Sequence, residues 1–193
     1  TDNRKVHCYP SPNEGRVYGA DGKKWGMAEM KLQLNQGREK LTNGYSGAVF
    51  YSVRYYLNLD YLGNPICGND VTTTMCEDLK ASHFQQKALV PPMTWKSTGS
   101  LEAPTELSIS GNTLTWQHNS AERYTVYIYP KGIEMKEAMK ESAYLQMVVY
   151  GNSFALPASF DVEKHNIAVC SYDRYGVEHS ATEYEVPLPD VTY

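Results

Sequence analysis

The sequence predicts an α+β chain in two parts, an N-terminal β/α segment over residues 1–96 and a C-terminal β-sandwich over residues 101–193. Three observations support this prediction. A chain of 193 residues is long enough for two domains of ordinary size. Residues 101–193 alternate apolar and polar side chains at the period of β-strands. Between the two parts, residues 88–104 contain a Pro-Pro pair and the flexible stretch STGS, which marks a domain boundary.

In the first part, residues 24–41 carry one apolar stripe at helical spacing, which predicts an amphipathic helix. The stripe contains Met27, Met30, Leu34 and Leu41. Residues 48–53 form a nearly continuous apolar run, typical of a parallel strand buried on both faces. A second short strand is expected at residues 6–9, so that the three elements make one β-α-β unit.

In the second part, residues 106–109 and 113–116 alternate on either side of Gly111-Asn112 and predict a β-hairpin. A third strand is expected at residues 123–129, with Tyr124, Val126 and Ile128 on one face. Residues 132–143 change to helical spacing and predict a short inserted helix. Further strands are expected at residues 145–150, 153–156, 166–172 and 182–186, and residues 173–176 form the turn of the last large hairpin.

Composition excludes several classes of function. The net charge is −4 and no basic cluster offsets it, so nucleic acid is not expected as a partner. No apolar run approaches the roughly 20 residues that cross a bilayer, so no transmembrane segment is expected. The N-terminal residues lack the apolar core of a signal peptide.

Metal and cofactor binding have no support in the sequence. Cys67 and Cys76 enclose a short polar loop that lacks both a CxxC pair and a nearby histidine, and the five histidines show no ligand spacing. A disulfide between these two cysteines and a pair of free thiols are both compatible with the sequence. Cys8 and Cys170 are the other two cysteines.

The second part resembles a fibronectin type III or immunoglobulin-like domain. The resemblance rests on the order LSISGNTLTWQH, RYTVYIY, GNSFALP and HNIAVCSYDRYGVEHSATEYEV. Trp116 stands at the position of that family's second-strand core tryptophan. His165 stands where the family has the tyrosine of its tyrosine corner, so the corner bond is either lost or made by the imidazole. The resemblance implies an accessory module without catalytic activity.

The first part resembles the C-terminal end of the (β/α)8 barrel in a glycosyl-hydrolase-like family, whose members in gut Bacteroidetes often carry a β-sandwich after the barrel. The resemblance rests on WGMAEMKLQLNQGR, GYSGAVFYSVRYYL and, most distinctively, KALVPPMTW. It implies that residues 47–53 are the eighth barrel strand and that residues 88–95 are the exit from the barrel. It also implies carbohydrate and an upstream part of the same protein as partners, and a periplasmic, cell-surface or secreted location.

No catalytic residue can be assigned from the sequence. Glycoside hydrolysis requires two carboxylates, which in barrels stand at the C-terminal ends of strands. Neither predicted strand ends in an acid, and Asp60 and Asp70 lie well into the following loop. Three interpretations therefore stay open: the C-terminal part of a glycoside hydrolase whose sandwich supports the barrel, a non-enzymatic module for carbohydrate or protein binding or adhesion, and a sandwich that itself binds carbohydrate.

Candidate ligand-binding residues are polar and aromatic side chains at the ends of the two predicted barrel strands. They are His7 and Tyr9 on one strand, and Tyr51, Arg54 and Tyr55 on the other. Tyr55, Tyr56 and Tyr61 would offer stacking surfaces at a sugar cleft, although packing beneath a long loop over residues 57–74 explains them equally well. In the sandwich, Tyr127 and Tyr129 alternate with the inward-facing residues and would form a surface aromatic patch or ordinary strand-surface positions.

The junction between the parts is too apolar for a free linker. Leu89, Val90, Met93 and Trp95 lie within seven residues, and burying each such side chain is worth roughly 1.5–3 kcal/mol. We therefore expect these side chains to be buried, with Trp95 in an interface between the two parts.

Overall fold

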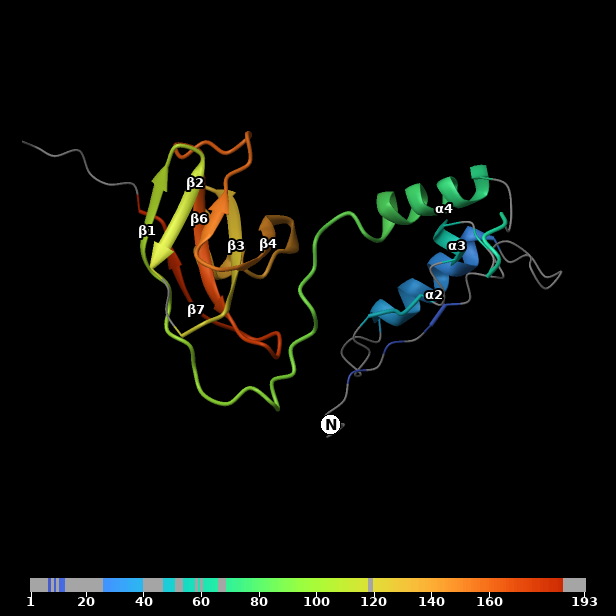
Figure 1. Ribbon diagram of the computed structural model, residues 1–193, viewed down its shortest axis with the longest axis horizontal. Coiled ribbons are helices and arrows are strands. Elements are labelled where there is room, and N and C mark those ends of the chain that lie inside the picture. The colour runs from blue at the N-terminus through green and yellow to red at the C-terminus, as the bar shows by residue number, and fades with distance from the viewer. Residues whose placement is uncertain are drawn as a thin grey trace, which may run out of the picture. The chain divides into compact units, whose positions relative to one another are not determined.

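The structure is a computed structural model, and it describes residues 7, 9, 11–12, 26–39, 47–50, 54–57, 59, 61–65, 69–117 and 120–185. The chain divides into two compact units, Thr1–Gln85 and Gln86–Tyr193. The fold is mixed α+β, with the longer helices in the first unit and two antiparallel sheets in the second (Figure 1).

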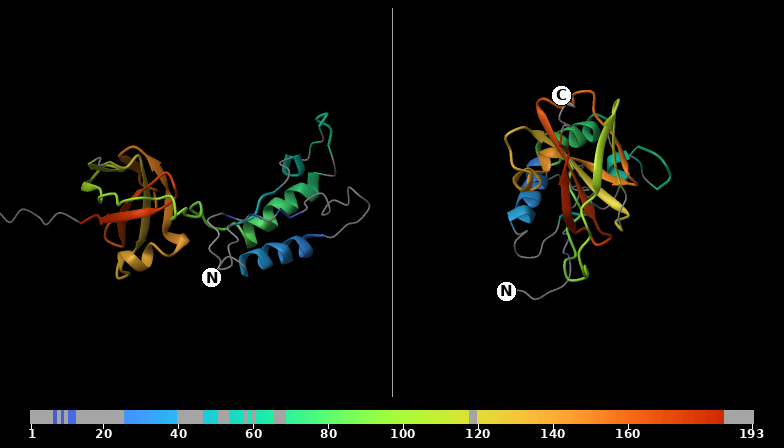
Figure 2. Two further views of the ribbon diagram at one scale, coloured as in Figure 1. Left: turned by 90° about the horizontal axis from the view of Figure 1, so that it is seen from below. Right: turned by 90° about the vertical axis from the view of Figure 1, so that its left-hand side faces the viewer.

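Two helices, α2 (Met27–Glu39) and α4 (Asn69–Ser82), organise the first unit. They run side by side (Figure 2) and bury one apolar cluster, made of Met30, Leu34, Met75 and Leu79. Each pair lies four residues apart in sequence, so both side chains fall on the same face of their helix. The Lys31 ammonium and the Asp78 carboxylate, 2.5 Å apart, form an ion pair between the helices. The predicted helix over residues 24–41 is thus confirmed over its central part.

The predicted β-α-β unit is not found in the described part of the first unit. His7 and Tyr9 lie outside any strand, and residues 47–50 have no regular secondary structure, with Val49 half exposed. The short helix α3 (Arg54–Leu57) stands where the strand was expected to end, and α4 begins inside the predicted loop. A short apolar run has no periodicity of its own, so it cannot distinguish a buried strand from an irregular segment beside helices.

The described part of the second unit, residues 86–117 and 120–185, contains seven antiparallel strands in two sheets. The three-stranded sheet has the order β1-β2-β5, and the four-stranded sheet has the order β4-β3-β6-β7. The strands are β1 (Thr105–Ser110), β2 (Thr113–Gln117), β3 (Arg123–Pro130), β4 (Leu145–Tyr150), β5 (Ser153–Ala155), β6 (His165–Tyr172) and β7 (Glu178–Glu183).

Six of these strands lie where the alternation predicted them, and the last begins earlier than predicted. Tyr172 pairs directly with Glu178, so β7 starts immediately after the tight turn at residues 173–177. The strand predicted over 182–186 overlaps β7 at residues 182–183 only, and residue 186 lies outside the described residues. The predicted start was wrong because the polar residues that follow the turn do not alternate with apolar ones.

The two sheets pack face to face around one core. Leu114, Trp116 and Phe154 enter it from the three-stranded sheet, and Val126 and Val169 are among those that enter from the four-stranded sheet. The edge of the Trp116 ring meets Tyr124 at a centroid distance of 5.3 Å. The core position predicted for Trp116 and the inward face predicted for β3 are confirmed.

A second apolar cluster covers the outer face of the four-stranded sheet. Helix α5 (Met135–Ala138) and the 3-10 turn η2 (Ser142–Tyr144) belong to the insert between β3 and β4 (Figure 1). Side chains of this insert pack against Tyr127 and Tyr129, which are 2% and 0% exposed. The prediction that these two tyrosines lie on the strand surface was wrong, because the insert turns the outer face into a second core.

Residues 86–97, here called the strap, precede β1 and are fixed to the sandwich. The Lys87 ammonium donates to the carbonyl of Gln146, and the Met93 amide donates to the Tyr175 carbonyl at 2.8 Å. Leu89 packs against the second apolar cluster. Leu89, Met93 and Trp95 are half-buried, whereas Val90 is 63% exposed and does not fit the predicted burial.

Candidate functional site

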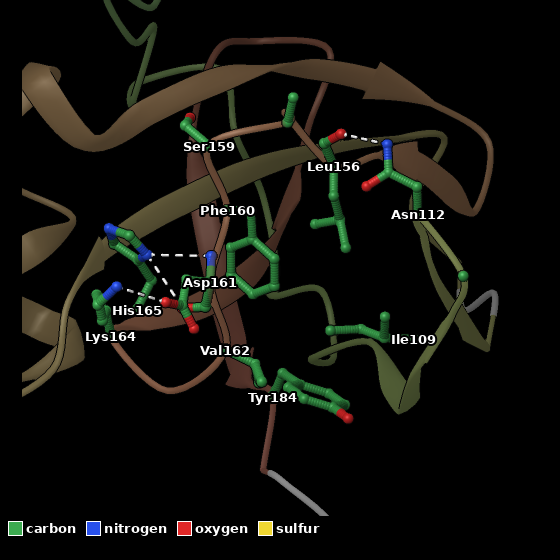
Figure 3. Close-up of a pocket in the computed structure, with 12 residues that line it drawn as sticks. Ile109, Asn112, Leu156, Ser159, Phe160, Asp161, Val162, Lys164, His165 and Tyr184 are labelled. Carbon is green, nitrogen blue, oxygen red and sulfur yellow. Dashed lines mark hydrogen bonds and ion pairs between the residues drawn. The ribbon is translucent and has the colours of Figure 1, made fainter.

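An open groove of about 730 Å³ lies at one end of the sandwich, between the β1–β2 turn and the segment that joins β5 to β6 (Figure 3). Both segments are connections between strands, where binding residues commonly gather. The residues that line it are Ile109, Gly111, Asn112, Leu156, Ala158, Ser159, Phe160, Asp161, Val162, Lys164, His165 and Tyr184.

The floor of the groove is an exposed margin of the sandwich core. Ile109, Phe160 and Tyr184 are half-buried and pack against the core cluster, while Leu156 is buried within it. The Phe160 amide donates to the Pro157 carbonyl at 2.9 Å, which closes a turn and places the ring at the groove. Figure 3 shows the Phe160 ring between His165 on one side and Leu156, Ile109 and Tyr184 on the other. The groove therefore offers ring faces and aliphatic surface to a ligand.

Polar groups form the rim of the groove. The Lys164 ammonium pairs with one oxygen of Asp161 at 2.8 Å, and the Glu163 amide donates to the other at 3.0 Å. These two hydrogen bonds, that of Lys164 foremost, lower the pKa of Asp161, and the same carboxylate raises the pKa of Lys164. Both groups are thus charged at neutral pH. On the opposite side, the Asn112 amide donates to the Leu156 carbonyl at 2.8 Å, which holds the β1–β2 turn against the groove.

His165 contacts the backbone of the loop that precedes β6. The Asp161 amide donates to its Nδ1 at 3.3 Å, and Nδ1 lies 3.1 Å from the Asp161 carbonyl oxygen. The ring also stands 6.1 Å from Phe160, tilted by 34°. The imidazole therefore ties the start of β6 to the loop before it, four residues upstream.

The groove and the residues predicted as ligand-binding do not coincide. In the first unit, the Tyr9 hydroxyl lies 3.3 Å from Nδ1 of His7, and the Tyr9 ring lies against Gly47. Tyr55 is half-buried on α3, which also contains Arg54, and Tyr51 lies outside the described residues. The structure thus brings His7 and Tyr9 together. Asp60, considered as an acid, is also outside the described residues.

Among the groove residues, Gly111 and Asn112 were expected only as a hairpin turn and His165 only as a candidate corner residue, so none of them was predicted to bind a ligand. One feature could have pointed to the groove: the polar loop ASFDVEKH contains a single aromatic residue between two strands. Polar loops of this kind are common in every sandwich, so the pattern has little specificity.

Another polar cluster in the second unit, around Glu178, is structural. The Glu178 carboxylate accepts hydrogen bonds from Thr125 at 2.5 Å and from Tyr127 at 2.7 Å, which satisfies two hydroxyls beneath the insert. Cys170 is fully buried in the same region, and burial raises the pKa of its thiol to about 12. Because the thiolate is the reactive form, Cys170 is not a nucleophile. Cys76 is a free, half-buried thiol.

Within the described residues, no three His, Cys, Asp or Glu side chains are grouped to hold a metal ion. Among the helices described, none has the length and apolar character needed to cross a membrane. Comparison with known proteins gave no match to this chain among family models, curated proteins or solved structures.

Proposed function

We propose that this chain is a non-catalytic region of a carbohydrate-active protein, and that its second unit is an accessory sandwich that binds a saccharide in the groove around Phe160. The observation that carries the proposal is the combination of ring faces and hydrogen-bonding groups in one open groove. Sugars present C–H faces that pack on aromatic rings and hydroxyls that need polar partners. Phe160 and Tyr184 supply the rings, and Asn112 and Ser159 supply polar groups at the margin.

The groove suits binding better than hydrolysis. A glycosidase needs a pair of carboxylates, one of them protonated so that it can act as the acid. Asp161 is the single carboxylate among the residues that line the groove, and its pKa is lowered, so it stays ionised. A lone ionised carboxylate paired with a lysine cannot fill both roles.

The wider context of the proposal comes from the two resemblances. Seven strands in a three-plus-four arrangement support assignment of the second unit to the fibronectin type III or immunoglobulin-like sandwiches. The resemblance of residues 5–95 to the end of a glycosyl-hydrolase-like barrel supports carbohydrate as the ligand. On this proposal the protein acts outside the cytoplasm, where such barrels meet polysaccharides.

The test is a saccharide titration of the full chain followed by saturation-transfer NMR and calorimetry. The panel contains oligomers of glucose, mannose, xylose and galacturonic acid. Tyr184→Ala should weaken binding on the order of tenfold, because loss of one ring contact removes about 1–1.5 kcal/mol. Ser159→Trp should also weaken binding, because it adds bulk at an exposed position that lines the groove and leaves the core intact.

Tyr150→Ala is the matched control. Tyr150 is an exposed tyrosine on β4 whose ring lies over Arg123, and it does not line the groove. Its removal should leave saccharide binding unchanged. Absence of binding across the panel, or binding that survives both groove variants, would reject the proposal.

A further inference from the structure

We infer that the ligand of the groove is an uncharged saccharide, bound mainly by the contact of one sugar ring with the aromatic floor, and not a uronic acid or an amino sugar. This inference rests on the proposed function and specifies its ligand. Three observations support it: the charge balance of the rim, the state of its polar groups and the arrangement of the rings.

The charges of the rim cancel within the groove itself. Asp161 and Lys164 are the acidic and the basic side chain among the lining residues, and their charged atoms lie 2.8 Å apart. A ligand carboxylate that approached Lys164 would also approach Asp161 and be repelled by it. A ligand ammonium that approached Asp161 would likewise approach Lys164 and be repelled by it. The two charged side chains of the groove already neutralise each other. A charged sugar would therefore lose its hydration without gaining a compensating ion pair.

The Nδ1 atom of the groove histidine is used by the protein. Nδ1 of His165 contacts the backbone of Asp161, and the ring stands beside Phe160. The other uncharged polar side chains that line the groove are Ser159, Asn112 and Tyr184, which present hydroxyl and amide groups. Neutral hydroxyls and amides both donate and accept, as the hydroxyls of a neutral sugar do.

The arrangement of rings indicates a short contact. His165 lies on one side of the Phe160 ring, and the groove opens toward Tyr184 and Ile109 on the other (Figure 3). One ring of a saccharide can pack there. Extended platforms for several sugars need a row of exposed rings, and the rings that line the groove are those of Phe160, His165 and Tyr184.

The experiment measures the affinity of the full chain for neutral and for acidic oligosaccharides. It is repeated at two salt concentrations and with one charge variant. Mannose, glucose and xylose hexamers represent the neutral class, and the galacturonic acid hexamer represents the acidic class. For the unmodified chain we expect at least one neutral hexamer to bind on the order of tenfold more tightly than the acidic hexamer. Its affinity should change less than about twofold between about 50 mM and 500 mM NaCl, because no net charge is neutralised on binding.

Asp161→Asn is the decisive variant, because it leaves Lys164 without its counter-charge at an almost unchanged shape. It should leave the affinity for the neutral hexamer within about threefold and raise the affinity for the acidic hexamer on the order of tenfold, in a salt-dependent way. The charge-preserving Asp161→Glu should retain the preference for neutral sugars.

Two results would overturn the inference in different ways. If the galacturonic acid hexamer binds the unmodified chain as tightly as the neutral hexamers, and Tyr184→Ala abolishes that binding, the groove binds saccharides but the ligand class is wrong. If no hexamer of either class binds, the proposed function fails and the inference fails with it.

Discussion

Asp173 anchors the strap, and replacing it by asparagine should destabilise the second unit. Its carboxylate accepts four contacts. The Ser97 hydroxyl donates to Oδ2 at 2.6 Å, and Nε2 of His179 lies 3.3 Å from the same oxygen. The amides of Tyr175 and Val177 donate to Oδ1 at 2.8 and 2.9 Å. The side chain is 14% exposed, so water cannot replace these partners.

The size of the destabilisation depends on which hydrogen bonds the asparagine side chain can keep. In Asp173→Asn the side-chain carbonyl would still accept from the two backbone amides, but the NH2 group would face Ser97 and His179, which in the natural chain contact a carboxylate oxygen. A hydrogen bond to a charged group contributes about 1.5–3 kcal/mol, and an unpaired buried donor costs about 1–3 kcal/mol. Loss of one strong bond with partial rearrangement of the other predicts a destabilisation of about 2–4 kcal/mol.

The measurement is urea unfolding followed by tryptophan fluorescence in a Trp25→Phe background. The remaining tryptophans, Trp95 and Trp116, both belong to the second unit, so the transition reports on that unit. Asp161→Asn is the control: the Asp161–Lys164 pair is exposed, so the change should move the midpoint far less. A shift for Asp173→Asn of less than about 0.5 kcal/mol would refute the anchoring role, since it would mean that the four contacts are replaced without cost.

The same residue gives the sign of the pH dependence. Burial by itself would raise the pKa of Asp173, but the hydrogen bonds from Ser97, Val177, His179 and Tyr175 outweigh it and lower the pKa. A lowered pKa in the folded state means that the carboxylate stabilises the fold above its unfolded pKa of about 3.9 and loses this effect as pH falls through the folded value. The stability difference between the natural chain and Asp173→Asn should therefore be constant near neutrality and shrink below about pH 4.

Three further predictions concern single positions in the second unit. Gly176→Ala should lower the free energy of unfolding by about 1–3 kcal/mol in the same urea assay, because φ is +78° and the new Cβ would lie 3.2 Å from the Val90 carbonyl oxygen. An unchanged midpoint would contradict the close approach of the strap. In a chain whose other three cysteines are replaced by serine, native Cys170 should react with iodoacetamide on the order of a thousandfold more slowly than a free thiol, because burial raises its pKa. Unfolding in urea should remove this protection. Rapid labelling of the native chain would show that the thiol is accessible. Glu106→Asn should stabilise the unit by roughly 0.5 kcal/mol, because Glu106 has φ of +53° and asparagine tolerates that region better; exposed Glu102→Asn is the control, and equal shifts would remove the backbone explanation.

The fold of the second unit could largely be predicted from the sequence because several of its strands carry strong local signals. Gly111-Asn112 fixes the first hairpin, and the alternation of Tyr124, Val126 and Ile128 fixes the inward face of β3. In such strands the register follows from the turn and from the buried face.

Apart from its first long helix, the first unit could not be predicted in the same way, because the pattern of its apolar residues does not indicate which elements they pack against. Phe50 belongs to the run interpreted as a buried strand, yet its ring packs edge-on against Tyr56 and Phe84, at centroid distances of 5.7 and 5.8 Å. Phe84 follows α4, in a segment for which the sequence predicted no element. An apolar side chain is stabilised equally by a sheet partner and by two aromatic rings beside helices, and the sequence contains no pattern that separates the two cases.

The buried tyrosines of β3 show why alternation alone does not locate a binding surface. Strict alternation says that Tyr127 and Tyr129 face away from Val126 and Ile128, and they do. Whether that second face meets water depends on residues 131–144, an insert whose helical spacing was visible in the sequence but whose position over the sheet was not. Once the insert covers this face, Tyr127 needs a buried acceptor, and Glu178 supplies it. An aromatic binding surface is therefore better sought where the core margin reaches a groove without a cover, and the end of the sandwich at Phe160 and Tyr184 meets this condition.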